Sequence, residues 1–155
     1  YFLMLESLQK GFSFGAGYRR QLLTFIYGPD LAQAALEALL KAPANSTYLL
    51  SEERCYTQKE YRRMAAGALG KKHVCSITVP LWGVKIVSAI AQKIGAARGK
   101  PSTLNSDKYN IMRQRNWRVD TTAAQRDFGF TAPTSLEQGL RQTVEWCRQA
   151  GWLKK

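Results

Sequence analysis

Residues 117–153, at the end of this 155-residue chain, carry the pattern that most constrains the fold. Two helix start-and-stop patterns follow one another there, around a Phe-Gly-Phe turn and a proline. Asp120 or Thr121 can start the first helix, because a short polar side chain accepts a hydrogen bond from the free amides of the first turn. Gly129 ends it, since glycine readily takes the left-handed conformation that closes helices. The sequence therefore predicts a short helix between these positions.

The second pattern begins with the tetrapeptide Thr-Ser-Leu-Glu at residues 134–137. Thr134 and Glu137 have the spacing of a capping box, in which each side chain bonds the backbone amide of the other residue. Apolar residues then recur at helical spacing until Gly151 ends the run. The residues expected on the buried face are Leu136, Leu140, Val144 and Cys147. This pattern predicts an amphipathic final helix that packs on the core.

Upstream, the sequence predicts a mixture of helices and strands. The chain is expected to start in a helix that stops at Gly11. A hairpin should follow, with a short strand, a turn at residues 15–17 and a second strand over residues 22–27. Asp30 is then expected to cap a helix, and a brief strand over residues 47–50 should come after it.

Thr57 and Glu60 form another capping box, which predicts a helix that closes at Gly70. The later elements expected are a strand over 73–79, a helix over 81–97 and a helix from Asn105 or Ser106 to near Asn116. Such a succession is typical of an α/β fold, or of an α+β fold if the chain is an isolated fragment. In either case helices should outnumber a few short strands.

Composition narrows the class of protein further. Hydrophobic residues make up 45% and charged residues 22% of the chain, as in a globular domain, so we expect one domain over residues 1–155. No stretch reaches the roughly 20 apolar residues that span a bilayer, and we expect no membrane partner. Three widely spaced cysteines and one histidine are too few for a zinc site. Unpaired cysteines are typical of reduced thiols, which predicts a cytoplasmic protein.

The net charge of +12 raises the question of nucleic-acid binding. The basic residues are spread along the chain in pairs, without a continuous tract. We therefore expect a solvated basic surface or an anionic small-molecule substrate, and no nucleic-acid partner. The alternative is a stand-alone basic module that binds nucleic acid or another anionic partner. Its binding residues would be Arg19, Arg20, Arg113, Arg115 and Arg118.

Few residues offer catalytic chemistry. Gly15 and Gly17 lack the strand-loop-helix setting of a dinucleotide-binding loop, so a hairpin turn is the simpler interpretation. His73 and Cys75 fall on one face of a predicted strand, but no third group that would orient them is evident. A further cluster can present guanidinium and amide groups to phosphate or carboxylate oxygens, or can be an exposed basic hairpin. This cluster contains Arg19, Arg20, Gln21 and Thr24.

Two stretches of the chain resemble one enzyme family. Residues 24–40, TFIYGPDLAQAALEALL, are similar to a strand-helix segment of the extended short-chain dehydrogenases/reductases, the NAD-dependent epimerase/dehydratase family. Residues 117–153 resemble the closing pattern of that family. The pattern consists of a tryptophan, an aspartate, a short helix, an aromatic-glycine turn, a proline and a final helix that ends in Gly-Trp-Leu. The order and spacing of these pieces hold over nearly the whole chain.

The resemblance implies the C-terminal, substrate-binding portion of a Rossmann-type enzyme whose N-terminal dinucleotide-binding domain is absent from this chain. It implies NAD or NADP in the full-length enzyme and none bound by this chain alone. The expected partner is a small-molecule substrate, a nucleotide sugar or a related alcohol, and the full-length protein can form a homodimer. The residues expected to line the substrate site are Arg20, Gln21, Thr24 and Tyr27.

Two departures from the family pattern limit what the resemblance implies. Gly28 and Pro29 stand where the family usually has a valine and a polar residue. The glycine-rich loop is missing, and no tyrosine has a lysine four residues later. In the family that tyrosine is the general acid/base, so no catalytic residue can be assigned. We therefore expect the isolated chain to be inert, and a regulatory relative that has lost its chemistry remains a further alternative.

Overall fold

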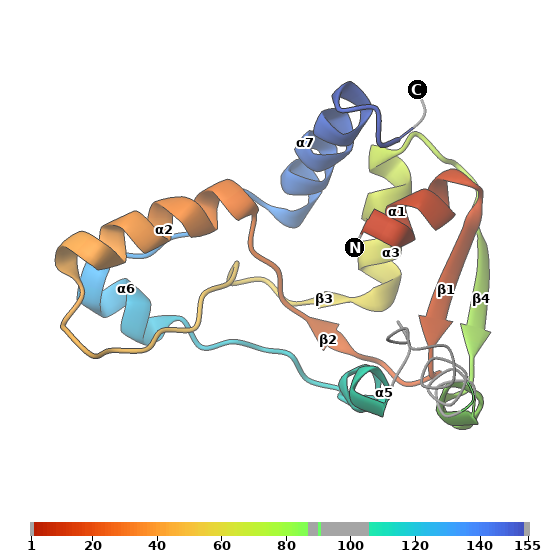
Figure 1. Cartoon of the computed structure of the whole chain (residues 1–155), viewed down its shortest axis with the longest axis horizontal. Helices are drawn as coiled ribbons and strands as arrows, with labels where there is room; N and C mark the ends of the chain where they lie inside the picture. The colour runs from red at the N-terminus through yellow and green to blue at the C-terminus, as the bar shows by residue number, and fades with distance from the viewer. Residues whose placement is uncertain (1, 87–89, 91–105, 154–155) are drawn as a thin grey trace.

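The computed structural model describes residues 2–86, 90 and 106–153. The molecule is elongated and has two lobes, which strands β2 and β3 connect (Figure 1). The larger lobe contains α1 (Phe2–Gln9), β1 (Phe12–Ala16), α3 (Gln58–Ala68), β4 (Cys75–Val79), α5 (Ser106–Arg113) and α7 (Leu136–Gln149). The smaller lobe contains α2 (Gly28–Lys41) and α6 (Thr122–Phe128). The connecting strands are β2 (Leu22–Leu23) and β3 (Tyr56–Thr57). The mixed α/β fold class predicted from the sequence is confirmed.

The core of the larger lobe is built from α1, α3 and α7. Leu8, Ala65 and Val144, one from each helix, are 0%, 0% and 1% exposed. The face predicted for the last helix is confirmed, because α7 buries Leu136, Leu140, Val144 and Cys147. We call this cluster the larger core; its other members include Leu5, Tyr56, Tyr61, Leu69 and Leu153.

The predicted hairpin is wrong, because β1 pairs with β4 and not with β2. The two strands run parallel, with Phe12 opposite Cys75 and Ala16 opposite Val79. The amide of Gly17 donates to the carbonyl of Val79 over 2.8 Å, so the glycine segment extends this pairing where a turn was expected. The second predicted strand shortens to β2, which pairs antiparallel with β3. The local sequence favours pairing of β1 with the next strand along the chain. Its actual parallel partner, β4, comes only after helices α2 and α3.

The caps of α3 and α6 follow the sequence closely. Thr57 accepts from the amide of Glu60, and the Glu60 carboxylate accepts from the amide of Thr57 over 2.7 Å, which confirms this capping box. Gly70 and Gly129, at φ +75° and +74°, close the two helices in the left-handed conformation. Asp120 accepts from the first amide of α6, that of Thr122, over 2.9 Å.

The starts of α2 and α7 differ from the prediction because Asp30 and Thr134 bond each other. Asp30 lies in the first turn of α2, after an N-cap at Tyr27 that forms no side-chain hydrogen bond. Its carboxylate accepts from both the amide and the hydroxyl of Thr134 over 3.0 Å. Ser135 is consequently the N-cap of α7, and it accepts from the amide of Gln138. The predicted roles of Asp30 as a helix cap and of Thr134 in a capping box are therefore wrong.

The smaller lobe has a smaller core. Ala34 of α2 packs with Ala124, Phe128 and Phe130 of α6 and its exit, and all four are buried. The strand predicted over residues 47–50 does not form, and this segment runs past the cluster without regular structure. It is held there by Tyr48, whose ring contacts Phe128 edge-to-face and whose hydroxyl donates to Asp127 over 2.8 Å. We call this cluster the smaller core.

The remaining predicted elements are described in part. The helix predicted over residues 81–97 is present at 81–86 and at residue 90, and its other residues lie outside the described ones. A later helix is predicted to begin at Asn105 or Ser106. Asn105 lies outside the described residues, and α5 begins at Ser106. None of the helices within the described residues has the length and apolar content needed to cross a membrane.

Candidate functional site

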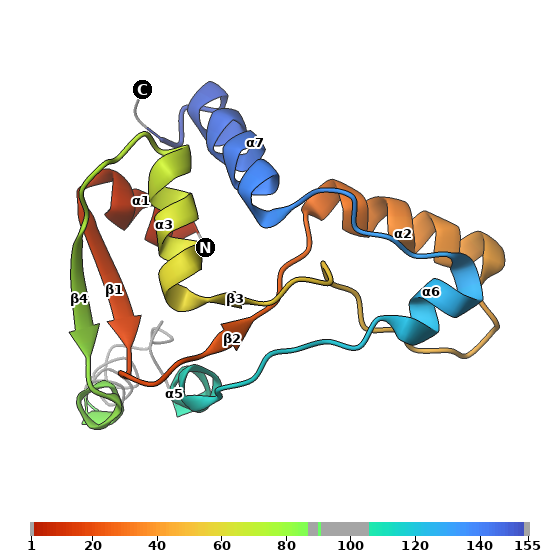
Figure 2. The same cartoon turned by 180° about the vertical axis from the view of Figure 1, so that it is seen from behind.

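The residues that connect the lobes follow one extended path. From behind, the chain that leaves α5 runs along β2 on its way to α6 (Figure 2). The amide of Leu22 donates to the carbonyl of Arg115 over 2.8 Å, and the amide of Trp117 donates back to Leu22 over 3.0 Å. On the other edge, Leu22 and Leu23 pair with β3. This segment, residues 20–27, is therefore held from both sides, and it carries all four predicted substrate-binding residues.

The structure does not bring these four residues into one cavity. Arg20 is exposed, whereas Gln21 and Thr24 line a hollow on the side of α3. Gln21 bonds the side chain of Gln58 and the carbonyl of Gln114, and Thr24 donates to the carbonyl of Trp117 over 2.6 Å. Tyr27 lines a different pocket, against α7. Their role in substrate binding stays a prediction.

The first hollow, which we call the arginine hollow, has a volume of about 410 Å³ and is formed by β1, β2, α3 and the chain near Trp117. Its residues include Gln21, Thr24, Gln58, Arg62, Phe14 and Trp117. The Nε atom of Arg62 donates to the carbonyl of Gln58 over 3.3 Å. Its Nη1 atom is buried and has no acceptor among the described residues. A guanidinium nitrogen in that position can donate to a carbonyl, carboxylate or phosphate oxygen.

Sequence reasoning missed Arg62, which stands beside Arg63 as one of the basic pairs spread along the chain. The available signal was weak: Gln58 and Arg62 are four residues apart on the helix that the Thr57 capping box predicts, so they share a face. Gly15 supplies the remaining space, because a Cβ atom there would lie 3.3 Å from Nη1 of Arg62. That proximity comes from the β1–β4 pairing, which the sequence did not reveal.

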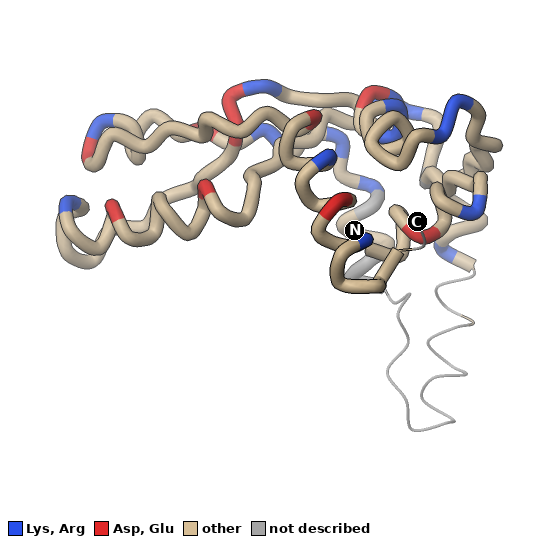
Figure 3. The backbone as a smooth tube through the Cα atoms, turned by 90° about the horizontal axis from the view of Figure 1, so that it is seen from above, with Lys and Arg blue, Asp and Glu red and all other residues tan. Residues whose placement is uncertain are grey.

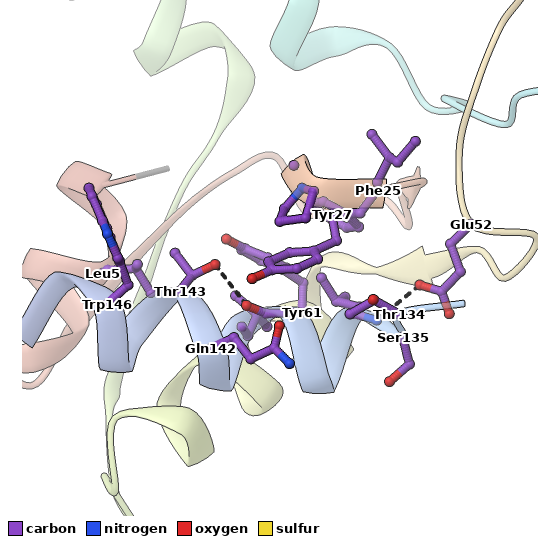
Figure 4. Close-up of a pocket in the computed structure, with 16 residues that line it drawn as sticks. Leu5, Phe25, Tyr27, Glu52, Tyr61, Thr134, Ser135, Gln142, Thr143 and Trp146 are labelled. Carbon is purple, nitrogen blue, oxygen red and sulfur yellow. Dashed lines mark hydrogen bonds between the residues drawn. The ribbon is translucent and has the colours of Figure 1, made fainter. Parts of the chain in front are cut away.

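The second cavity, which we call the apolar pocket, lies between the start of α2 and one face of α7 (Figure 4). It has a volume of about 510 Å³. Its lining residues are Leu5, Phe25, Ile26, Tyr27, Gly28, Pro29, Glu52, Tyr61, Thr134, Ser135, Leu136, Gly139, Leu140, Gln142, Thr143 and Trp146. Most of these side chains are apolar or aromatic, which is typical of small-molecule pockets.

The single carboxylate of this pocket belongs to Glu52 and is already engaged. Its two oxygens accept from the hydroxyl of Tyr56 over 2.6 Å and from the amide of Leu136 over 3.0 Å. Burial, followed by the bond to Glu52, raises the pKa of Tyr56 to about 12, so its hydroxyl stays protonated and donates to the carboxylate. Glu52 therefore has a structural role at the base of α7.

Tyr61 separates the two cavities and lines both of them. Its ring stacks on that of Phe25, with centroids 4.8 Å apart and an interplanar angle of 10°. Phe25 and Tyr61 both line the apolar pocket, and Tyr61 also lines the arginine hollow. One aromatic side chain thus divides an apolar space from a space that contains a guanidinium.

The other residues weighed for chemistry lie apart from both cavities. His73 and Cys75 are exposed at the start of β4. Within the described part of the chain, no three His, Cys, Asp or Glu side chains gather in a way that could hold a metal ion. Lys and Arg occur along the whole described backbone, in both lobes, without forming one block (Figure 3).

No family model matches the chain. It is 29% identical over 126 residues to the ceramide reductase of Caulobacter vibrioides, a match that covers 80% of this chain and 39% of that protein. The dTDP-glucose 4,6-dehydratase of Streptomyces venezuelae has a TM-score of 0.68 and 16% identity, covering 98% of this chain and 39% of its own. The UDP-glucose 4-epimerase of Thermotoga maritima has a TM-score of 0.64 and 19% identity, and the match covers 96% of this chain and 38% of the epimerase. The chain spans about two fifths of the length of these proteins.

These structural neighbours are extended short-chain dehydrogenases/reductases, and the likeness extends over nearly the whole chain. The family resemblance inferred from residues 24–40 and 117–153 is thereby confirmed in the fold. The chain has the fold of part of an enzyme of the NAD-dependent epimerase/dehydratase family.

Proposed function

We propose that this chain is the substrate-binding portion of an NAD(P)-dependent enzyme that acts on a hydroxyl or carbonyl carbon of a small molecule. The sequence relative is a ceramide reductase, and the structural neighbours include an epimerase solved with UDP-glucose and a dehydratase solved with NAD. The candidate substrates are accordingly a nucleotide sugar or a related alcohol. The catalytic tyrosine and lysine, the cofactor domain and a homodimer interface are assigned to the part of the relatives that this chain does not span.

The arginine hollow is the observation that carries this proposal. It brings Gln21 and Thr24, two of the residues expected from the family resemblance, beside a guanidinium whose buried Nη1 has no acceptor in the described part of the chain. A buried donor without an acceptor is costly, by about 1–3 kcal/mol, so a site that retains one is a candidate for ligand binding. In this proposal Arg62 donates to an oxygen of the substrate, and the backbone carbonyl of Gln58, which accepts from Nε of Arg62, helps to fix the guanidinium.

The described residues do not fit a dinucleotide. A pyrophosphate site of this class needs a glycine-rich loop that leads directly into the N-terminus of a helix. Here Gly15 belongs to β1 and Gly17 continues its pairing with β4, and the next regular element is β2. We therefore place no step of the reaction on cofactor contacts made by this chain.

The proposal is tested first with the isolated chain. Calorimetry with NADH and NADPH should give no tight binding, and no oxidation of either should be detected in the presence of aldehydes or ketones. Turnover of a nicotinamide cofactor by the chain alone, or tight binding of one, would contradict the proposal.

A second test uses a protein that joins this chain to its cofactor domain, with two neighbouring arginines as a matched pair. Arg62 lines the arginine hollow, whereas Arg63 is exposed. Arg62→Gln should raise KM by about tenfold or more, because a charge-assisted hydrogen bond contributes about 1.5–3 kcal/mol. Arg63→Gln should leave KM unchanged. Equal effects of the two substitutions would argue against a role for the hollow.

One structural observation favours the alternative of a basic binding module. The parallel bridge between Leu22 and Asn116 places the segment after Arg19 and Arg20 beside the segment that contains Arg115 and Arg118, and these four arginines are exposed. If they bind nucleic acid, the affinity should fall steeply with salt, because phosphate neutralisation releases counterions. Titration of single-stranded and duplex DNA at rising salt distinguishes the two functions.

A further inference from the structure

The charge of the apolar pocket differs from that of the molecule around it. The chain carries a net charge of +12, yet none of the residues that line this pocket is a lysine, an arginine or a histidine. The one ionisable acid, Glu52, has both oxygens engaged by Tyr56 and Leu136. The pocket therefore offers no counter-charge to a phosphate, and its residual charge is negative.

We infer that the apolar pocket binds the hydrocarbon portion of an uncharged alcohol or ketone, and that nucleotide sugars are excluded from it. A nucleoside diphosphate would bring negative charge to a site without a cation, and an unpaired buried charge is strongly unfavourable. A hydrocarbon chain needs only apolar surface, which Leu5, Phe25, Leu136 and Leu140 provide. This inference names the substrate class of the proposed function and rests on that proposal.

The shape of the pocket depends on Gly139. A Cβ atom at this position of α7 would lie 3.1 Å from Cδ2 of Tyr27, so the glycine allows the tyrosine ring to lie against the helix. Tyr27 thereby becomes a side wall, and Figure 4 shows it facing Thr143 and Gln142 of α7 across the opening. The volume of about 510 Å³ is within the range of roughly 300–1,000 Å³ that is usual for small-molecule sites.

Tyr61 provides an aromatic wall against which a hydrocarbon chain can lie. Its ring stacks on that of Phe25, with centroids 4.8 Å apart, and both residues line the apolar pocket. A compound that is polar throughout, such as a sugar, would leave this wall unused.

The experiment is a calorimetric titration of the chain with 1-hexanol, 1-octanol and 1-decanol. Burial of each methylene is expected to tighten binding about fourfold, so each step of two methylenes should tighten it by roughly fifteenfold. UDP-glucose at millimolar concentration should not displace 1-decanol.

A matched pair of variants on α7 locates the binding. Thr143 lines the pocket, and Gln138 is an exposed residue of the same helix outside it. Thr143→Trp should fill the pocket and weaken 1-decanol binding by tenfold or more, whereas Gln138→Trp should leave it unchanged. Circular dichroism melting of both variants checks that each remains folded.

Three results would overturn the inference: no binding of any alcohol, binding that ignores chain length, or equal affinities of the two variants for 1-decanol. None of them bears on the proposed function, which fails on a different measurement, the turnover or tight binding of NAD(P)H by the chain.

Discussion

The two lobes bury very different amounts of apolar surface, although each is built around packed helices. The larger core draws on three helices and buries residues such as Leu8 and Val144 almost completely. The smaller core has four buried members, and two of them are alanines. On α2, Leu39 and Leu40 remain 81% and 73% exposed. The larger lobe thus has the more extensive core, although it also exposes apolar side chains such as Phe14 and Trp82, whereas in the smaller lobe the described residues leave an apolar face of α2 uncovered.

The largest expected effect tests the contrast between the two cores directly. Leu8→Ala should lower the free energy of unfolding by about 2–5 kcal/mol, because it opens a cavity in a core that is closed on all sides. Leu39→Ala makes the same chemical change on the exposed face of α2 and should change stability by less than about 0.5 kcal/mol. Urea unfolding of both variants measures the difference, and similar losses would remove the contrast.

The next effect concerns the contact between α2 and α7. Asp30→Ala removes both acceptors of Thr134 and should cost about 1–3 kcal/mol, because the amide of Thr134 loses its partner. Hydrogen exchange should quicken in the first turns of α2 and α7 and change little in α3. Gln33→Ala, at an exposed position of α2, is the control. Unchanged exchange in α7 would mean that this bond does not couple the two helices.

A smaller effect is expected from the helix caps. Thr57→Ala removes a reciprocal capping box from α3 and should cost about 1 kcal/mol. Ser135→Ala removes a single acceptor, 3.4 Å from the amide of Gln138, and should cost less. Thermal unfolding ranks the two variants.

The smallest effect is a difference in acid sensitivity between the lobes. The bond from Arg126, and then that from Tyr48, holds the pKa of Asp127 below its usual value, and Thr122 lowers the pKa of Asp120. A carboxyl whose pKa is depressed by folding stabilises the folded state above its unfolded pKa, and this stability is lost as pH falls through the folded pKa. Both groups belong to α6 or its start, so the protection factors of the α6 amides, which correct for the intrinsic exchange rate at each pH, should fall between neutral pH and pH 3.

The control for this pH effect lies in the larger lobe. There Glu60 also has a lowered pKa, chiefly because of its bonds to Thr57. Asp127→Asn should flatten the pH dependence of exchange in α6, and Glu60→Gln should flatten it only in α3. A response of α6 that persists in Asp127→Asn would assign the acid sensitivity to another group.

The features that could be predicted from the sequence are those that depend only on residues close together in the chain. The capping box of Thr57 and Glu60 and the glycine stops at Gly70 and Gly129 need only a few adjacent residues, and they are confirmed. The parallel pairing of β1 with β4 depends on a strand about sixty residues away, as the contact of Phe14 with Ile77 illustrates. No local pattern encodes that choice.

The errors at the candidate site have the same origin. Thr134 has the sequence of a helix cap, but the Asp30 carboxylate binds it from 104 residues away, and the cap moves to Ser135. Arg62 gave no signal of its own, because its importance arises from Gly15 and Gln58, which the strand pairing and the helix bring around it. Of the predicted substrate residues, Thr24 and Tyr27 fall in one predicted strand, directly after Gln21, but the sequence could not show that Tyr27 faces another cavity.

The path of residues 22–25 also affects how the chain folds. Its hydrogen bonds reach Glu52 on one side and Arg115 and Trp117 on the other, the last across 93 residues. Contacts with such long sequence separation form late, because the intervening loop must close first. Until the end of the chain is synthesised, this strand has an open edge that can pair with another molecule.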